Sequence, residues 1–229
     1  MTIPASDSRL VWDLPVRVTH WALVLAVAGC WATHYAGVEW FTWHRRLGYT
    51  VLVLVAFRIV WGFVGTRHAR FGSFVRGPRM LLAYLRERGP ATIGHNPLGA
   101  LSVIALLALL LLQAATGLFA NDEIMNMGPF YGWIAPELSN RITSLHRASS
   151  EWQLVLIGLH VAAVAFYVRV RRQPLVNAMI TGRKPAAEVP AAEAIAGSRA
   201  LLAIVIVAVL AVGLAIAVRL APEATIALY

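Results

Sequence analysis

The stretch that decides the fold is TSLHRASSEWQLVLIGLHVAAVAFYV, residues 143–168. It is long enough to cross a lipid bilayer, because about 20 mostly apolar residues at a rise of about 1.5 Å each span the hydrocarbon core. It carries two histidines, His146 and His160. Their spacing returns to within about 40° of the same helix face and separates them by about 21 Å along the axis. One transmembrane helix therefore presents two imidazoles to one side, near opposite faces of the membrane.

Four further stretches are long and apolar enough to span a membrane, namely residues 16–36, 44–64, 97–119 and 200–218. Of the 229 residues 59% are hydrophobic and 14% charged, against about 45–50% and about 25% in soluble domains. This composition excludes a disordered chain and an ordinary soluble enzyme, and it predicts an all-α integral membrane protein. The single cysteine, Cys30, excludes an internal disulfide, a cysteine-based zinc site and covalent c-type haem attachment.

Charge placement predicts the orientation of the chain. The formal net charge is +9, and the connections 65–96 and 169–199 hold most of the basic excess. The connection 37–43 contains no lysine or arginine, and the connection 120–142 contains only Arg141. By the positive-inside rule, the N-terminus and both basic connections face the cytoplasm and the C-terminus lies in the periplasm. The excess is thus explained by membrane topology without a nucleic-acid partner. Residues 1–15 lack a signal-peptide cleavage pattern, so the first span is expected to be retained.

Ionisable residues inside a membrane span are functional candidates. Two imidazoles on one face at two depths favour two stacked haems, each iron taking its second imidazole from another helix; a role in packing is the alternative. His20 lies at the depth of His160. At the other depth both His34 and His44 match His146, and periodicity excludes neither.

The second span favours His44. One helical stripe contains His44, Gly48, Val51, Val55, Arg58 and Gly62. Glycines on such a stripe let a flat macrocycle approach the backbone, and Arg58 lies at the depth of the inner haem, where it either pairs with a propionate or snorkels toward the cytoplasm. Four further cations flank the candidate ligands and are expected to pair with propionates: Arg17, Arg45, Arg46 and Arg147.

These residues lie in motifs that resemble those of the bacterial cytochrome b561 and nickel–iron hydrogenase cytochrome b family. The motifs follow one another between residues 10 and 185 and are Trp12-x4-Arg17-x2-His20-Trp21, Trp43-His44-x2-Leu47-Gly48-Tyr49, Phe57-Arg58-x2-Trp61-Gly62, Arg67-His68-Ala69-Arg70-Phe71, Gly94-His95-Asn96-Pro97-Leu98-Gly99, Leu145-His146 with Leu159-His160, and Met179-Ile180-Thr181-Gly182-Arg183-Lys184.

The resemblance implies a four-helix transmembrane bundle that holds two b-type haems with bis-histidine ligation. It implies an inner haem between His20 and His160 and an outer haem between His44 and His146, and it leaves His34 outside the motifs. We expect a di-haem domain over residues 1–185, a flexible tether over 186–199, and a fifth transmembrane helix with a short tail over 200–229 that faces lipid or a partner subunit.

Three polar residues near the inner connection have two interpretations each. Asn96 either hydrogen-bonds a propionate or caps the third span ahead of Pro97. His68 and His95 either contact a propionate or a quinone, or are simply solvated.

A bis-histidine haem has no open coordination position, so it passes electrons and binds no oxygen. We expect an electron-transfer cytochrome of the bacterial inner membrane, working between a quinone pool and a redox partner. The resemblance implies a periplasmic cytochrome c or a hydrogenase as that partner. The chain has no iron–sulfur, nucleotide or flavin motif of its own, so substrate chemistry would belong to the partner. The alternatives are a self-contained superoxide:quinone oxidoreductase and a haem-free membrane anchor or transporter.

Overall fold

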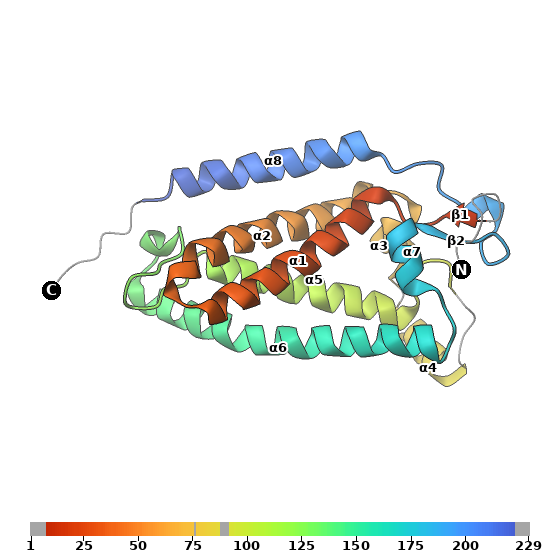
Figure 1. The fold of residues 1–229 in the computed structure, drawn as a ribbon, viewed down its shortest axis with the longest axis horizontal. Helices are drawn as coiled ribbons and strands as arrows, with labels where there is room; N and C mark the ends of the chain where they lie inside the picture. The colour runs from red at the N-terminus through yellow and green to blue at the C-terminus, as the bar shows by residue number, and fades with distance from the viewer. Residues whose placement is uncertain (1–7, 76, 88–91, 223–229) are drawn as a thin grey trace. The chain divides into compact units, whose positions relative to one another are not determined.

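A computed structural model describes residues 8–75, 77–87 and 92–222 of the chain. Within these residues five helices are long and apolar enough to cross a membrane (Figure 1). They are α1 (Leu14–Ala36), α2 (Phe41–Val64), α5 (Pro97–Gly117), α6 (Pro136–Arg169) and α8 (Ala200–Arg219). The all-α membrane architecture with five spans is confirmed. Arg76 and Arg88 of the first basic connection lie outside the described residues.

The helix α6 begins earlier than its apolar sequence predicts, at Pro136 instead of residue 143. Proline is well tolerated at the first helical position, because the N–H it lacks would have no partner within the helix. The added turns are polar, and the Thr143 hydroxyl donates to the Ser139 carbonyl within the helix at 2.9 Å. Hydropathy marks the apolar part of a helix, and here the helix continues beyond it.

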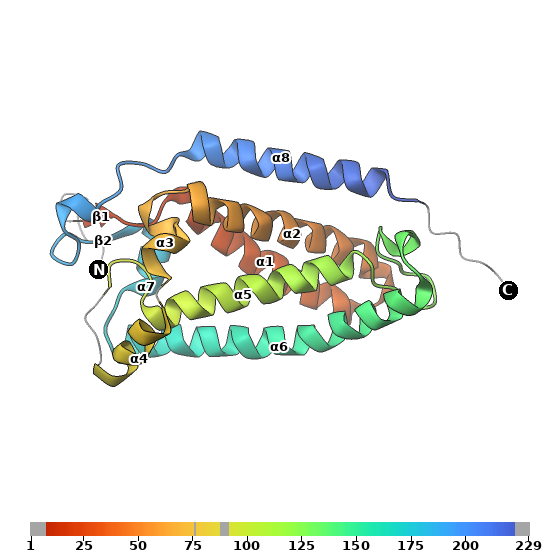
Figure 2. The same cartoon turned by 180° about the vertical axis from the view of Figure 1, so that it is seen from behind.

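The contacts divide the chain into two compact units, and the division falls within the long helices. The first unit comprises Met1–His20, Arg58–Leu106 and Leu156–Ile204, and the second comprises Trp21–Phe57, Leu107–Val155 and Val205–Tyr229. Each of the five long helices thus contributes one part to each unit. In both units α5 and α6 run side by side (Figures 1 and 2).

The first unit also contains the short elements of the chain's two basic connections. They are η3 (Arg67–Ala69), α3 (Phe71–Phe74), α4 (Pro78–Glu87), α7 (Leu175–Thr181), η5 (Ala191–Glu193) and the strand β2 (Arg183–Pro185). The strand β1 (Ser8–Leu10), which precedes α1, belongs to the same unit. The strands pair antiparallel, with Arg9 opposite Lys184. The second unit adds η2 (Val38–Trp40) and η4 (Tyr131–Trp133).

Gly182 joins α7 to the strand pair. It ends α7 with φ 80°, a left-handed conformation that glycine adopts without strain. Its carbonyl accepts hydrogen bonds from the backbone N–H groups of Val11 and Trp12 at 2.8 and 3.0 Å. A Cβ at this position would meet the Trp12 carbonyl oxygen at 2.6 Å, so the Gly182 motif fixes the entry to α1.

Asp13 is a buried carboxylate in the core of the first unit. It accepts hydrogen bonds from the indole Nε1 of Trp61 at 3.1 Å, from the Thr66 hydroxyl, and from the backbone N–H of Val16 at 2.7 Å. A buried charge needs this number of partners, because water no longer solvates it. The carboxylate therefore ties the start of α1 to the end of α2.

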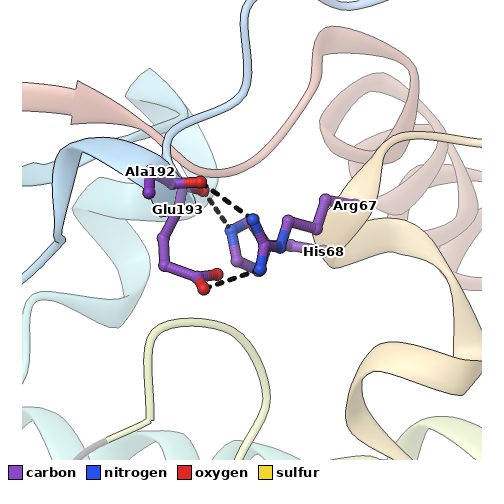
Figure 3. Close-up of polar contacts among 4 residues, drawn as sticks. All are labelled: Arg67, His68, Ala192 and Glu193. Atoms are coloured by element: carbon purple, nitrogen blue, oxygen red, sulfur yellow. Dashed lines mark hydrogen bonds and ion pairs between the residues drawn. The ribbon is translucent and has the colours of Figure 1, made fainter.

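The segment 186–199 is held against the first unit, which differs from the expectation of a flexible tether. Arg67 donates to the Ala192 carbonyl at 2.8 Å and to the Glu193 carboxylate at 2.7 Å, and His68 Nε2 donates to the Glu193 carbonyl at 2.8 Å (Figure 3). Val189 is fully buried. Composition indicated flexibility, but the arginine and histidine of another connection satisfy the segment's backbone carbonyls.

Candidate functional site

In the second unit, His44 on α2 is oriented by the backbone of α1. Its Nδ1 lies 3.0 Å from the Cys30 carbonyl oxygen, so Nδ1–H donates and the tautomer leaves the Nε2 lone pair available. This is the arrangement typical of a histidine that ligates a metal through Nε2.

His146 on α6 is oriented in a similar way by α5. Its Nδ1 lies 3.0 Å from the Gln113 carbonyl oxygen and 3.1 Å from the Thr116 hydroxyl. The Gln113 side-chain amide nitrogen lies 3.2 Å from Nε2, and its oxygen accepts a hydrogen bond from Ser149. Gln113 was not among the residues predicted from the sequence; a glutamine inside an apolar span was the available signal. Both His44 and His34 are close enough to His146 to interact with its charge.

His34 lies beside His44 and His146, with its ring centroid 6.2 Å from that of His44. Its side chain is exposed, and the aromatic rings next to it, Trp31 and Tyr35, come from its own helix. His44, by contrast, is half-buried and is oriented by a neighbouring helix. The geometry therefore favours His44 over His34 as the partner of His146.

The glycines predicted to admit a macrocycle differ from one another. A Cβ at Gly48 would meet nothing within 4 Å, whereas a Cβ at Gly62 would lie 2.1 Å from the ring of Phe71. The absence of a side chain at Gly62 therefore accommodates the Phe71 ring, and contact of Gly62 with a cofactor stays a prediction. Gly117 of α5 is a second close approach, because a Cβ there would lie 3.1 Å from Cε1 of His146.

In the first unit, His20 on α1 and His160 on α6 are close enough to interact electrostatically. The Ser102 hydroxyl of α5 lies 3.3 Å from His160 Nδ1. The structure thus brings together a histidine pair in each unit, and in both units α6 supplies one member.

Arg58 lies inside the first unit and does not extend to the surface. The residue is 6% exposed, its guanidinium donates to the Ala69 carbonyl at 3.2 Å, and its Cζ lies 5.4 Å from the centroid of the Phe71 ring. The Asp13 carboxylate is close enough to interact with its charge. Of the two interpretations of Arg58, the structure favours an internal role over snorkelling.

Two cations lie close to His95, and we define Arg58, His95 and Lys184 as the cationic cluster. Burial, followed by the positive charges of Arg58 and Lys184, lowers the pKa of His95 to about 3. Burial also lowers the pKa of Lys184. Among the described residues, the buried atoms Arg17 Nε and His95 Nδ1 have no hydrogen-bond partner. Unpaired buried nitrogens beside cations form a site suited to carboxylates.

The remaining predicted residues have other contacts. Asn96 caps α5, because its Oδ1 accepts the Gly99 backbone N–H at 2.7 Å, which favours the capping interpretation over the cofactor role. The guanidinium of Arg45 lies over Phe41 at 5.9 Å and that of Arg46 over Trp43 at 5.1 Å. Arg147 is exposed next to His146.

Comparison with known proteins gives a family and several relatives. The sequence model of the family described as prokaryotic cytochrome b561 matches residues 11–182. Proteins named probable Ni/Fe-hydrogenase B-type cytochrome subunit are similar to the chain. The one from Azotobacter chroococcum mcd 1 is 24% identical over 208 residues, covering 75% of this chain and 86% of its own. The one from Rhodobacter capsulatus is 27% identical over 221 residues, covering 80% and 84%.

A third such relative, from Rhizobium leguminosarum bv. viciae, is 28% identical over 220 residues, covering 78% of this chain and 89% of its own. No solved structure matches the chain significantly. The matched residues include all four histidines of the two pairs and the whole cationic cluster except Lys184. The chain therefore belongs to the prokaryotic cytochrome b561 family of membrane-spanning, haem-containing electron-transport proteins.

Proposed function

We propose that this chain is a di-haem cytochrome b that carries electrons between a quinone pool and a redox protein partner, as the membrane subunit of a respiratory oxidoreductase. The family implies haem b as the cofactor. The names of the relatives favour a nickel–iron hydrogenase as the partner, and a periplasmic cytochrome c fulfils the same chemical role.

The observation that carries the proposal is the presence of one histidine pair in each unit, His20 with His160 and His44 with His146. Haem b with two axial imidazoles exchanges single electrons between its ferric and ferrous states and offers no position for a substrate on iron. Two such sites in one chain are what electron transfer across a membrane requires, whereas a single packing histidine would support no such role.

The surrounding residues fit the two cofactors. The carbonyls of Cys30 and Gln113 hold the imidazoles of His44 and His146 by Nδ1, so that Nε2 carries the lone pair that iron would take. On His146 the side-chain amide of Gln113, whose nitrogen lies 3.2 Å from Nε2, would turn aside when iron is bound. The open space at Gly48 admits a flat ring on the same stripe of α2. In the first unit, the cationic cluster supplies buried donors for the propionates. Asp13 alone does not neutralise the positive charge of this cluster.

We further propose an orientation in the bacterial inner membrane. Both basic connections and the described part of the N-terminal segment belong to the first unit, so the positive-inside rule assigns this unit to the cytoplasmic side. His20 and His160 would then hold the inner haem, and His44 and His146 the outer haem. A hydrogenase or cytochrome c in the periplasm would exchange electrons with the outer one.

A haem count followed by a quinol reaction tests the proposal. We expect a pyridine haemochrome assay on the detergent-purified chain to give two b haems per chain, and addition of a quinol to reduce them. A protein without haem, made in cells that synthesise it, would overturn the proposal in favour of an anchor or transporter. If the isolated chain reduced quinone with superoxide as donor, the self-contained superoxide:quinone oxidoreductase would replace the subunit interpretation.

A further inference from the structure

The second unit contains a cavity of about 370 Å³ that the proposed electron transfer does not use. One wall is formed by Arg45, Arg46 and Tyr49 in the first turns of α2, and a second by residues 127–129 in the connection after α5. The third wall is formed by Val218 at the end of α8 and by Ala221 and Pro222 just after it. The cavity therefore lies between the start of α2 and the end of α8. The sequence predicted for the fifth helix only that it faces lipid or a partner subunit.

This cavity opens on the side of α2 that faces away from the proposed haem. Arg46 lies about 200° around the helix from His44, and Tyr49 lies about 140° from it. The stripe that contains His44 and the open space at Gly48 thus points elsewhere. Arg45, about 100° from His44, and Arg46 both line this cavity. For Arg46 this position argues against the predicted role as a propionate partner, and for Arg45 that role stays a prediction.

The described residues that line the cavity include two arginines and no carboxylate. Neither Arg45 nor Arg46 forms an ion pair with a carboxylate among the described residues, and their guanidinium groups lie over the aromatic rings of Phe41 and Trp43. The other lining residues include the apolar Met127, Pro129, Val218, Ala221 and Pro222. Two unpaired guanidinium groups beside apolar walls fit an anion that has an apolar part.

The depth of the cavity identifies the class of anion. It lies where α2 begins, at Phe41, and where α8 ends, at Arg219, and both helices belong to candidate membrane spans. Helix ends of this kind lie at the level of the lipid headgroups. Below that level α8 exposes Val209, Val212 and Ile216, an apolar surface along which acyl chains can pack.

We propose that this cavity binds the phosphate group of an anionic phospholipid through Arg45 and Arg46, with the acyl chains against α8, so that the lipid fastens the fifth helix to the rest of the second unit. Arginine forks pair with phosphate by two parallel hydrogen bonds. The Tyr49 hydroxyl, which is close enough to Arg45 to interact with its charge, provides a further donor.

Native mass spectrometry of the haem-loaded chain tests this inference with dioleoyl-phosphatidylglycerol as the probe. We expect one tightly bound lipid per chain, and binding at least about tenfold weaker in the double variant Arg45→Gln/Arg46→Gln, because charge-assisted hydrogen bonds are lost. The double variant Arg141→Gln/Arg172→Gln removes the same charge from exposed positions and should bind the probe as the wild type does. Dioleoyl-glycerol, which has the chains without the phosphate, should not bind tightly.

Three outcomes would overturn the inference: no bound phosphatidylglycerol in the wild type, equal binding by the Arg45/Arg46 variant, or displacement of the lipid by millimolar inorganic phosphate, which would make the site one for free phosphate. The variant Ala221→Leu keeps both arginines but fills part of the cavity beside its apolar wall, so it should also weaken lipid binding. It serves as the test if the Arg45/Arg46 variant fails to fold. Because haem content is measured on the same samples, a failure of the lipid site is distinguishable from a failure of the proposed cytochrome function.

Discussion

Replacement of Gly48 by leucine probes the place of the proposed outer haem most specifically. A Cβ at Gly48 would meet no atom of the chain within 4 Å, so the polypeptide itself tolerates a side chain there. Leucine also favours a helix over glycine by about 0.8 kcal/mol. Without a haem on this face, the substitution should therefore be neutral or slightly stabilising.

With a macrocycle against this face, the same leucine occupies its space. Overpacking of a filled site costs about 1–3 kcal/mol, which corresponds to haem binding that is weaker by a factor of about 5–150. We therefore expect Gly48→Leu to lower the pyridine haemochrome ratio from two haems per chain toward one, with the loss confined to the outer haem in the redox-resolved spectrum.

Gly158→Leu is the matched control. A Cβ at Gly158 would also meet nothing within 4 Å, but this position on α6 is exposed and lies about 200° around the helix from His160. It should retain both haems. A Gly48→Leu protein that bound two haems with unchanged spectra would refute the assignment of the macrocycle to this face of α2.

Four further substitutions test individual contacts. Asp13→Asn weakens an acceptor of three hydrogen bonds and should lower the free energy of unfolding by about 1–3 kcal/mol, seen as a lower melting temperature. Arg58→Leu removes a buried positive charge and should lower the midpoint potential of the inner haem alone, by on the order of 50 mV; an unchanged redox titration would contradict this. Glu193→Gln breaks an ion pair whose side chains are partly exposed and should change stability by less than about 1 kcal/mol, leaving the proteolysis pattern of segment 186–199 as in the wild type. Desolvation raises the pKa of Asp122, but hydrogen bonds from the backbone N–H groups of residues 124–126 lower it overall. The ionised carboxylate therefore stabilises that connection at neutral pH, and this stabilisation is lost as the pH falls below about 4. Hydrogen exchange at those amides should accelerate in acid, and Asp122→Asn should abolish the acceleration.

Hydropathy predicted the five spans because a membrane helix must bury its own backbone in a continuous apolar run. The predicted and observed limits of the fifth span, 200–218 and Ala200–Arg219, differ by one residue. The largest difference, at the start of α6, arises where the helix becomes polar and the apolar signal ends. The docking of segment 186–199 could not be predicted, since it depends on Arg67 and His68 of a distant connection.

Spacing and depth, which are properties of single helices, predicted histidine pairs at two levels but left His34 and His44 open; the stripe on the second span and the family resemblance favoured His44. What surrounds them depends on how different helices pack. Gly62 and Gly48 lie on one stripe and look equivalent in the sequence, yet Phe71 fills the space at Gly62. Gln113 and the carbonyl of Cys30 orient the imidazoles from neighbouring helices, and no spacing rule along one helix predicts such contacts.

The most direct test of the central claim is the haem content of single histidine variants, measured by pyridine haemochrome and redox-resolved optical titration. The account predicts that His20→Ala and His160→Ala lose the same haem, that His44→Ala and His146→Ala lose the other, and that His34→Ala retains both. A His44→Ala protein with two full haems, together with a His34→Ala protein that lacks one, would contradict it.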